Sequence, residues 1–169
     1  THQCPAGTSM TERPRILWVN VRLLHPLNGG DRLRTYHMLR QMRRHAHVTY
    51  LCPRTPLDAP AALEKAAEYC DELITFDLDP PRSGTPRFYA SVLWNCLTGS
   101  RPFASQKYFS KTARSLITAQ LAEKKHDLVI ADYLMSWTHF AKLKPAPHVP
   151  AIVFQHNVES LIWKRHTEA

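Results

Sequence analysis

The sequence predicts an α/β domain with a Rossmann-like, doubly wound parallel sheet. Short apolar runs alternate with helix-length segments along most of the chain, which is the pattern of a parallel sheet with helical crossovers. Several of these runs are apolar on both faces, as buried parallel strands are. A glycine turn, Asn28-Gly29-Gly30, also separates the first apolar run from the first helical segment, where open α/β sheets bind ligands.

Five segments have the length and composition of strands. They are residues 16–21, 47–52, 72–76, 128–132 and 151–155. Helices are expected between and after them, with apolar residues recurring at three- and four-residue steps. These helices start at about residue 31, with an apolar stripe as far as Ala46, and cover 61–69, 87–97, 110–124 with Ser110 as N-cap, 135–142 and 158–167.

Two successive helices between residues 85 and 125, joined by residues 98–102, interrupt the simple alternation, and we expect this insertion to form one wall of a cleft. Residues 1–14 contain prolines and glycine without periodicity, and they are expected to be a flexible leader to a domain over 15–169. The sequence ends in a helical segment that directly follows a strand, so we expect a fragment of a longer protein.

The charge predicts an anionic partner. The chain of 169 residues has a formal net charge of +8 and a pI near 9.6, which leaves nucleic acid, phospholipid headgroups and phosphorylated small molecules open. No membrane-spanning run and no signal peptide are recognisable, so a soluble, cytoplasmic domain is expected. Cys4, Cys52, Cys70 and Cys96 show no metal or redox spacing, and we expect free buried thiols.

The glycine turn is the first candidate site. Gly29 and Gly30 let the backbone adopt positive φ and approach a ligand closely, and the free N–H groups of the following helix favour an anion. Arg32 lies in the same loop and adds positive charge. The competing interpretation is a plain glycine-rich connector, because no full phosphate-binding fingerprint is present.

The carboxyl ends of the last two strands supply the other candidates. His156 ends an apolar strand beside a helix start, where an imidazole can donate to a hydroxyl or phosphate or accept a proton. Asp132 is expected at the same edge, where it orients His156, binds a substrate hydroxyl or caps the next helix. Asn157 is explained as well by an N-cap, and Glu159 by the helix dipole, as by ligand binding.

No metal or other cofactor is expected, since His37, His45 and His47 lack the spacing of a metal site. Arg40, Arg43 and Arg44 form either a solvated helix face or a surface that attracts anionic lipid. In the second case the inserted segment supplies aromatic side chains as interfacial anchors. These are Trp94, Phe103, Tyr108 and Phe109.

Several segments together resemble a known family. Residues 14–19 (PRILWV), 26–36 (PLNGGDRLRTY) and 47–49 (HVT) resemble the start of family-4 glycosyltransferases of the GT-B fold. Residues 127–130 (DLVI), 149–153 (VPAIV) and 155–160 (QHNVES) look like later segments of the same N-terminal domain, particularly in sugar transferases of bacterial exopolysaccharide clusters. The likeness runs from Arg15 to Ala169 in the right order.

The resemblance implies the N-terminal, acceptor-side half of a retaining two-domain enzyme that transfers a hexose from a nucleotide-diphosphate sugar to a saccharide or lipid-linked acceptor. By match, Gly29 and Gly30 lie near the donor diphosphate, and His156 lies near the transferred sugar. The paired glutamates of the C-terminal, donor-binding domain have no counterpart here, so this chain alone is expected to be inactive. Peripheral contact with the inner membrane fits such an enzyme.

Two other classes stay open at this point. A basic nucleic-acid-binding module fits the charge, although no helix-turn-helix, RRM or zinc-finger pattern occurs. A stand-alone flavodoxin-like or receiver domain fits the alternation of strands and helices, although Asp132 is then the one plausible phosphorylatable aspartate and no acidic cluster for magnesium accompanies it.

Overall fold

A computed structural model describes residues 13–99, 102–141, 143, 149–157 and 159–168. Residues 1–12, which make up most of the expected leader, lie outside the described part. Five strands form a single parallel sheet in the order β3-β2-β1-β4-β5. They are β1 (Arg15–Val19), β2 (His47–Arg54), β3 (Glu72–Asp77), β4 (Leu128–Asp132) and β5 (Ala151–Phe154).

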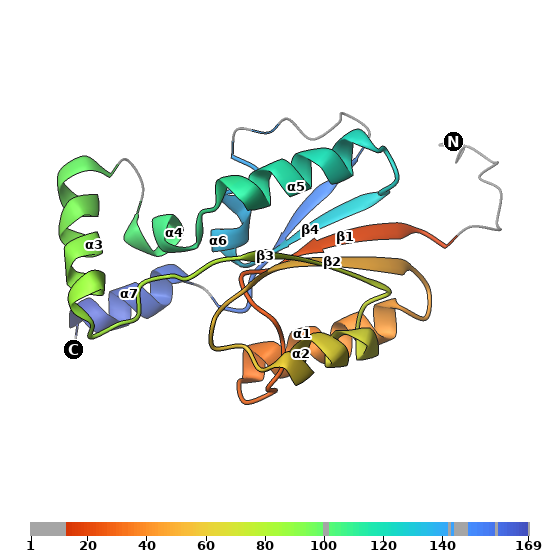
Figure 1. Ribbon diagram of the computed structural model, residues 1–169, viewed down its shortest axis with the longest axis horizontal. Helices are drawn as coiled ribbons and strands as arrows, with labels where there is room; N and C mark the ends of the chain where they lie inside the picture. The colour runs from red at the N-terminus through yellow and green to blue at the C-terminus, as the bar shows by residue number, and fades with distance from the viewer. Residues whose placement is uncertain (1–12, 100–101, 142, 144–148, 158, 169) are drawn as a thin grey trace.

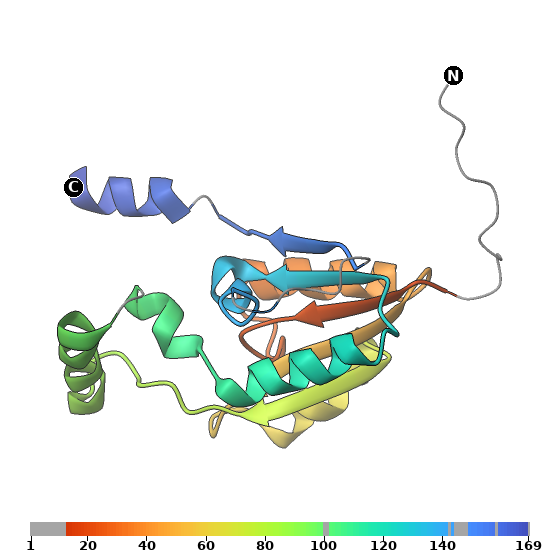
Figure 2. The ribbon, with the colours of Figure 1, turned by 90° about the horizontal axis from the view of Figure 1, so that it is seen from above.

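The helices cover both faces of this sheet, which confirms the doubly wound Rossmann-like fold (Figures 1 and 2). On one face lie α1 (Gly30–Met42), α2 (Pro60–Glu64) and the 3-10 turn η1 (Lys65–Glu68). On the other face lie α5 (Lys111–Ala122) and α6 (Tyr133–Trp137). Two further helices, α3 (Pro86–Thr98) and α7 (Glu159–Glu168), project beyond the edge where the strands end (Figure 2).

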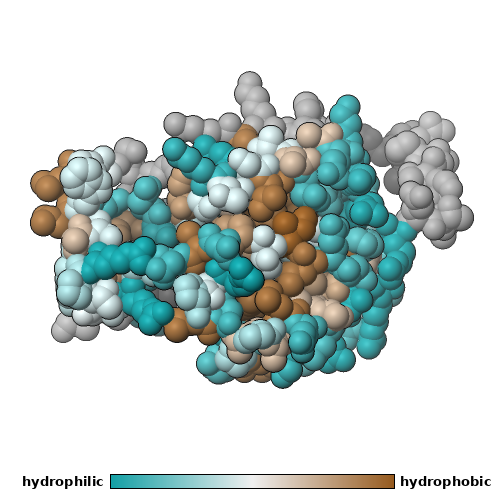
Figure 3. All heavy atoms as spheres, viewed as in Figure 1, coloured by the Kyte–Doolittle hydropathy of each residue, from teal (hydrophilic) through white to brown (hydrophobic). Residues whose placement is uncertain are grey.

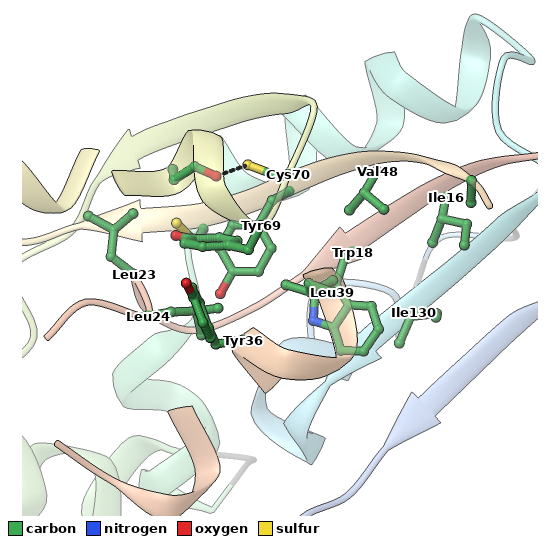
Figure 4. Packing of buried hydrophobic residues seen from close by; sticks show 14 of the residues in the cluster. Ile16, Trp18, Leu23, Leu24, Tyr36, Leu39, Val48, Tyr69, Cys70 and Ile130 are labelled. Atoms are coloured by element: carbon green, nitrogen blue, oxygen red, sulfur yellow. Dashed lines mark hydrogen bonds between the residues drawn. The ribbon is translucent and has the colours of Figure 1, made fainter. Parts of the chain in front are cut away.

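The core is divided into two layers because side chains of β1 alternate across the sheet. Ile16 and Trp18 point into the layer under α1, while Leu17 and Val19 point into the layer under α5. Figure 4 shows the first layer, where Trp18 and other fully buried side chains pack together. Its largest fully buried members are Trp18, Tyr50 and Tyr69, and Cys70 donates a hydrogen bond from Sγ to the Ala66 carbonyl (3.2 Å).

The strand positions were predicted correctly, and several helices differ from expectation. The segment expected as one helix over 61–69 is divided into α2 and η1. A short helix, α4 (Phe103–Tyr108), lies between the two helices expected in the insertion. Ser110 caps α5 as expected, since its side chain accepts from the Ala113 N–H.

The helix α6 is shorter than expected and starts earlier. It ends at Trp137, and residues 138–141 continue as turns in which N–H groups bond to carbonyls three residues back. The Thr138 hydroxyl also donates to the Met135 carbonyl (2.7 Å), which favours this tighter geometry. Lys142, where the helix was expected to end, lies outside the described residues.

Not all of the cysteines are buried. Cys52 and Cys70 are buried in the core, whereas Cys96 is exposed on α3, contrary to the expectation of buried thiols. Cys4 lies outside the described residues. Among the helices that the structure describes, none combines the length and the apolar character needed to cross a membrane.

Candidate functional site

Asp132 lies at the centre of the polar groups gathered where the strands end. It is the last residue of β4, and its side chain is fully buried. Three donors converge on its Oδ2: Trp18 Nε1 (3.1 Å), Asn20 Nδ2 (2.7 Å) and the Thr35 hydroxyl (3.1 Å). The other oxygen, Oδ1, lies 2.8 Å from His156 Nε2. Asp132 therefore joins β1, α1, β4 and the segment that follows β5.

Asp132 also occupies the N-cap position of α6, where its side chain could instead cap that helix. Its side chain makes no capping hydrogen bond to α6, so the contact with His156 is the better account of this residue. Burial raises the pKa of the Asp132 carboxyl, and hydrogen bonds from His156, Trp18 and Thr35 offset part of that shift. A buried carboxylate keeps its charge only when hydrogen bonds of this kind compensate for the loss of water.

His156 is held on three sides. Its ring stacks on Tyr133 (4.5 Å between centroids, 28° between planes) and meets the edge of Phe154 (4.9 Å, 78°). The side chain is only 4% exposed, and Nε2 faces Asp132. In the described part of the chain Nδ1 is buried and has no hydrogen-bond partner. With Asp132 as a carboxylate, Nε2 carries a proton, and in the neutral ring Nδ1 is then an acceptor without a donor.

A second group of contacts joins the turn after β4 to the start of α1. The Tyr133 hydroxyl donates to Asp31 Oδ2, and Arg22 Nη1 lies 3.6 Å from the same oxygen. Burial raises the pKa of Asp31, but hydrogen bonds from Tyr133 and the Arg32 N–H outweigh it, so the pKa lies below its usual value. Burial and the hydrogen bond to Asp31 raise the pKa of Tyr133.

The glycine turn leads into α1 beside the Asp31 carboxylate. Neither Gly29 nor Gly30 has a positive φ, and Gly29 is the extended residue before α1. A Cβ on Gly29 would lie 2.6 Å from Asp31 Oδ1, whereas one on Gly30 would meet nothing within 4 Å. The Asp31 carboxylate accepts the Arg32 N–H at the helix N-terminus. The chain's own carboxylate therefore lies at the helix N-terminus, where the sequence predicts an anion, and ligand binding at the glycine turn stays a prediction.

The remaining predicted residues lie further from His156. Arg32 donates from Nη1 to the Pro26 carbonyl (3.0 Å). Asn157 is exposed. The described part of α7 begins at Glu159, and residue 158, where the helix was expected to start, lies outside the described residues. Nothing is described of the Glu159 side chain. The structure therefore brings together His156 and Asp132, and not the full predicted set.

Several contributors to the site were not predicted from the sequence. Asn20 directly follows an apolar run, and Thr35 lies on the buried side of α1; polar residues in such positions are the signal that was overlooked. Arg34 lies over the Phe154 ring (4.9 Å from its centroid), and Arg22 lies over the Tyr133 ring (5.4 Å). These two guanidinium groups add positive charge around the histidine.

The inserted segment forms a hollow of about 620 Å³ beside α3 and α4. Its lining combines an aromatic ring of each helix, Trp94 and Phe103, with Arg87 and Lys107. Arg87 forms an ion pair with Asp79 at the start of the insertion. Within the described ranges, no three His, Cys, Asp or Glu side chains come together in a way that would hold a metal ion.

Two of the basic residues expected on one helix face, Arg40 and Arg43, make local contacts. Arg43 binds Asp71 through Nε and Nη2 (3.1 and 3.0 Å) and also donates to the Ala67 carbonyl. Arg40 lies over the ring of Tyr36 (5.4 Å). Arg43 thus joins α1 to the segment before β3, which is a structural role.

Comparison with solved structures reveals fold relatives at low identity. UGT2 of Phytolacca americana, a glycosyltransferase whose structure holds UDP-2-fluoro-glucose and pterostilbene, matches 95% of this chain with a TM-score of 0.52 and 14% identity. The C-terminal domain of a hydrogenase from Pyrococcus furiosus matches 87% of this chain and 94% of its own, with a TM-score of 0.46 and 13% identity. No protein-family model and no curated protein matches the sequence.

The match to UGT2 shows a shared fold. The five-stranded parallel sheet with helices on both faces is thus of the kind found in a GT-B glycosyltransferase. The match covers 34% of that protein, so the chain spans about a third of its length.

Proposed function

We propose that this chain is the N-terminal, acceptor-side domain of a family-4 glycosyltransferase of the kind found in bacterial exopolysaccharide clusters. The enzyme transfers a hexose from a nucleotide-diphosphate sugar to a saccharide or lipid-linked acceptor, with retention at the anomeric carbon. The observation that carries the proposal is the pair of Asp132 and His156, which leaves a buried Nδ1 without a partner among the described residues. The shared fold with UGT2 supports it.

His156 is the residue that contacts substrate in this proposal, which requires a neighbouring side chain to move, because the ring is 4% exposed and Nδ1 is buried. A neutral imidazole whose Nε2–H is held by Asp132 offers Nδ1 as an acceptor to a sugar hydroxyl. Tyr133 and Phe154 fix the plane of the ring, so the acceptor atom is positioned before substrate arrives. Asp132 is the positioning residue, because it determines which ring nitrogen carries the proton.

The glycine turn faces the donor diphosphate in this proposal. Because the Asp31 carboxylate already accepts the Arg32 N–H, we expect the diphosphate on the open side of Gly30, where a Cβ would meet nothing. In a retaining transfer the acceptor hydroxyl attacks the same face that the diphosphate leaves. Backbone N–H groups and nearby arginines stabilise the charge on the departing group.

The proposal assigns nucleotide binding to a second, C-terminal domain with paired glutamates. No metal and no further cofactor has a role in it. These 169 residues are expected to be inactive on their own, and the enzymatic tests need the full-length protein.

The deciding experiment measures nucleoside diphosphate release by the full-length enzyme with panels of nucleotide sugars and saccharide acceptors. We expect His156→Ala to lower kcat by about 100-fold, the scale of a lost catalytic hydrogen bond or proton-transfer group. His45→Ala, at an exposed position after α1, is the matched control and should retain full activity. If His156→Ala kept wild-type activity, His156 would have no role in the reaction and the proposed site would be wrong.

Proton NMR of the product reports the anomeric outcome, and inversion would exclude a retaining enzyme.

A further inference from the structure

A buried histidine lies at the end of the sheet opposite to the candidate site. His126 is in the segment between α5 and β4, and it is only 5% exposed. Its Nε2 lies 2.9 Å from Gln120 Oε1 on α5. Within the described part of the chain, Nδ1 is buried and has no hydrogen-bond partner. A neutral His126 therefore donates to Gln120 from Nε2 and keeps Nδ1 as an unused acceptor.

The strands begin beside this histidine. Arg15, the first residue of β1, is bonded twice to Asp127: the Arg15 N–H donates to the Asp127 carboxylate, and the Asp127 N–H donates to the Arg15 carbonyl (both 2.8 Å). Arg15 also pairs with His47, the first residue of β2. Because Leu17 points toward α5 and side chains alternate along a strand, Arg15 and His47 lie on the face that α5 covers.

Charged groups of both signs act on this histidine from four elements. They are Arg15 of β1, His47 of β2, Glu72 of β3 and Glu123 after α5. The first two oppose a positive charge on the His126 ring, and the two glutamates favour one. Each glutamate has another partner, since the Thr49 hydroxyl donates to Glu72 (3.0 Å) and Lys125 pairs with Glu123 (2.9 Å). Burial, reinforced by the guanidinium, lowers the pKa of His126 from its ordinary value of 6.5.

We propose that His126 is a pH-sensitive contact, which holds the C-terminal end of α5 on the sheet while its ring is neutral and releases that end when the ring is protonated. The second proton would be carried by Nδ1, a buried atom with no acceptor among the described residues. A buried cation without an acceptor is costly, and the positive charge of Arg15 adds repulsion. Movement of the ring into water relieves both, and it breaks the hydrogen bond to Gln120.

The C-terminal end of α5 is the part of this helix that can open with the least loss of packing. Ser110 caps the start of the helix, and Ala113 and Ile117 are fully buried, whereas Leu121 in the last turn is 8% exposed. This last turn lies at the end of the sheet where β4 begins (Figure 1). On the face shown in Figure 3, hydrophilic side chains gather at the same end of the molecule. A released turn would therefore enter a polar, hydrated region.

The direction of the pH dependence follows from the two states of the contact. When the turn is open, His126 is in water and its pKa is the ordinary 6.5, whereas in the closed form the pKa is lower. The open form therefore binds the proton first. The contact stabilises the closed form fully above about pH 6.5, and this contribution is lost as the pH falls from there through the pKa of the closed form.

Amide hydrogen exchange of the full chain between about pH 8 and about pH 5, the range in which histidine changes charge, tests the proposal. After correction for the intrinsic pH dependence of exchange, protection of the amides of residues 120–124 should fall by about tenfold in acid, the scale of one unmet hydrogen bond in a buried group. His126→Gln keeps an amide donor for Gln120 and cannot gain a proton, so its protection should not change with pH. His45→Gln, at an exposed position after α1, is the control and should behave as wild type.

Proton NMR titration of His126 in the wild-type chain gives a second test. We expect its pKa below 6.5. Arg15→Met should raise this pKa and Glu72→Gln should lower it, because the two changes remove charges of opposite sign. A wild-type pKa at or above 6.5 would overturn the proposal, as would protection of residues 120–124 that does not depend on pH. An equal loss of protection in wild type and His126→Gln would assign the release to another group and would also overturn it.

Discussion

The hydroxyl of Tyr133 donates a hydrogen bond to Asp31 Oδ2 at 2.5 Å, which joins the residue after β4 to the first turn of α1. Tyr133 has a φ of 70°, in the left-handed region that is costly for a residue with a bulky side chain. In this conformation its ring stacks on His156 while its hydroxyl reaches Asp31. Tyr133 thus contacts both Asp31, which follows the glycine turn, and His156.

Removal of this hydroxyl should destabilise the fold and change the titration of Asp31. We expect Tyr133→Phe to lower the free energy of unfolding by about 1–2 kcal/mol near neutral pH, the cost of a hydrogen bond to a charged group. The pKa of Asp31 should rise, because Tyr133 is the strongest of the partners that lower it. Urea denaturation and NMR titration measure the two effects. Tyr89→Phe on α3 is the control, and equal effects of both changes would contradict the role of the Tyr133–Asp31 bond.

Asp132→Asn should move the proton of His156 from one nitrogen to the other. Trp18, Asn20 and Thr35 all donate to Oδ2, so they should hold the amide oxygen in that position and leave the NH₂ group facing Nε2. Nε2 must then accept, and Nδ1 changes from acceptor to donor. We expect kcat of the full-length enzyme to fall by about 100-fold with little change in KM.

Nitrogen-15 NMR of the histidine ring reports the tautomer directly in the same variant. A loss of activity with Nε2 still protonated would mean that Asp132 supports the fold and does not select the tautomer. An altered tautomer with full activity would show that Nδ1 does not act as an acceptor in the reaction.

Acid should weaken the contact between Asp71 and Arg43. Burial raises the pKa of Asp71, but hydrogen bonds from the Val48 N–H and from Arg43 outweigh it and lower the pKa. A carboxyl with a lowered folded-state pKa stabilises the protein above its unfolded pKa of about 4, and this contribution disappears as the pH falls through the folded value. Asp71→Asn should therefore cost about 1–2 kcal/mol at neutral pH and progressively less below about pH 4.

Unfolding free energies measured between neutral pH and acid test this dependence. Asp77→Asn removes the carboxylate that pairs with Arg54 and is 80% exposed, so it should change stability by less than about 1 kcal/mol at any pH. A constant difference between wild type and Asp71→Asn across the whole range would exclude the titration of Asp71 as its cause.

The two glycines should respond in opposite directions to alanine. Gly30→Ala introduces a Cβ into open space and a better helix former into α1, so it should stabilise the fold by about 0.5–1 kcal/mol. Gly29→Ala places a Cβ against the Asp31 carboxylate, and displacement of that group should cost about 1 kcal/mol. Thermal denaturation measures both. Full activity of Gly30→Ala in the complete enzyme would argue against a diphosphate approaching there.

The fold was predictable because five apolar runs and the helical spacing between them are local signals. The meeting of Asp132 and His156 was also predictable, since both lie at the carboxyl ends of strands of one parallel sheet and such strands end at the same edge. Local spacing does not reveal that Trp18, Asn20 and Thr35 converge on one carboxylate oxygen, because these donors come from different elements. The short helix α4 was missed because six residues carry too little periodicity.

The central place of β1 in the sheet has a consequence for the order in which the molecule is assembled. β1 pairs with β2, the next strand in the chain, and with β4, so that Asn20 meets Asp132 across 112 positions of sequence. During synthesis the β1–α1–β2 unit is complete before Asp132 and His156 leave the ribosome. The contacts of Trp18 and Thr35 with Asp132, and of Asp132 with His156, therefore form only when the last strands have been made, at the end of folding.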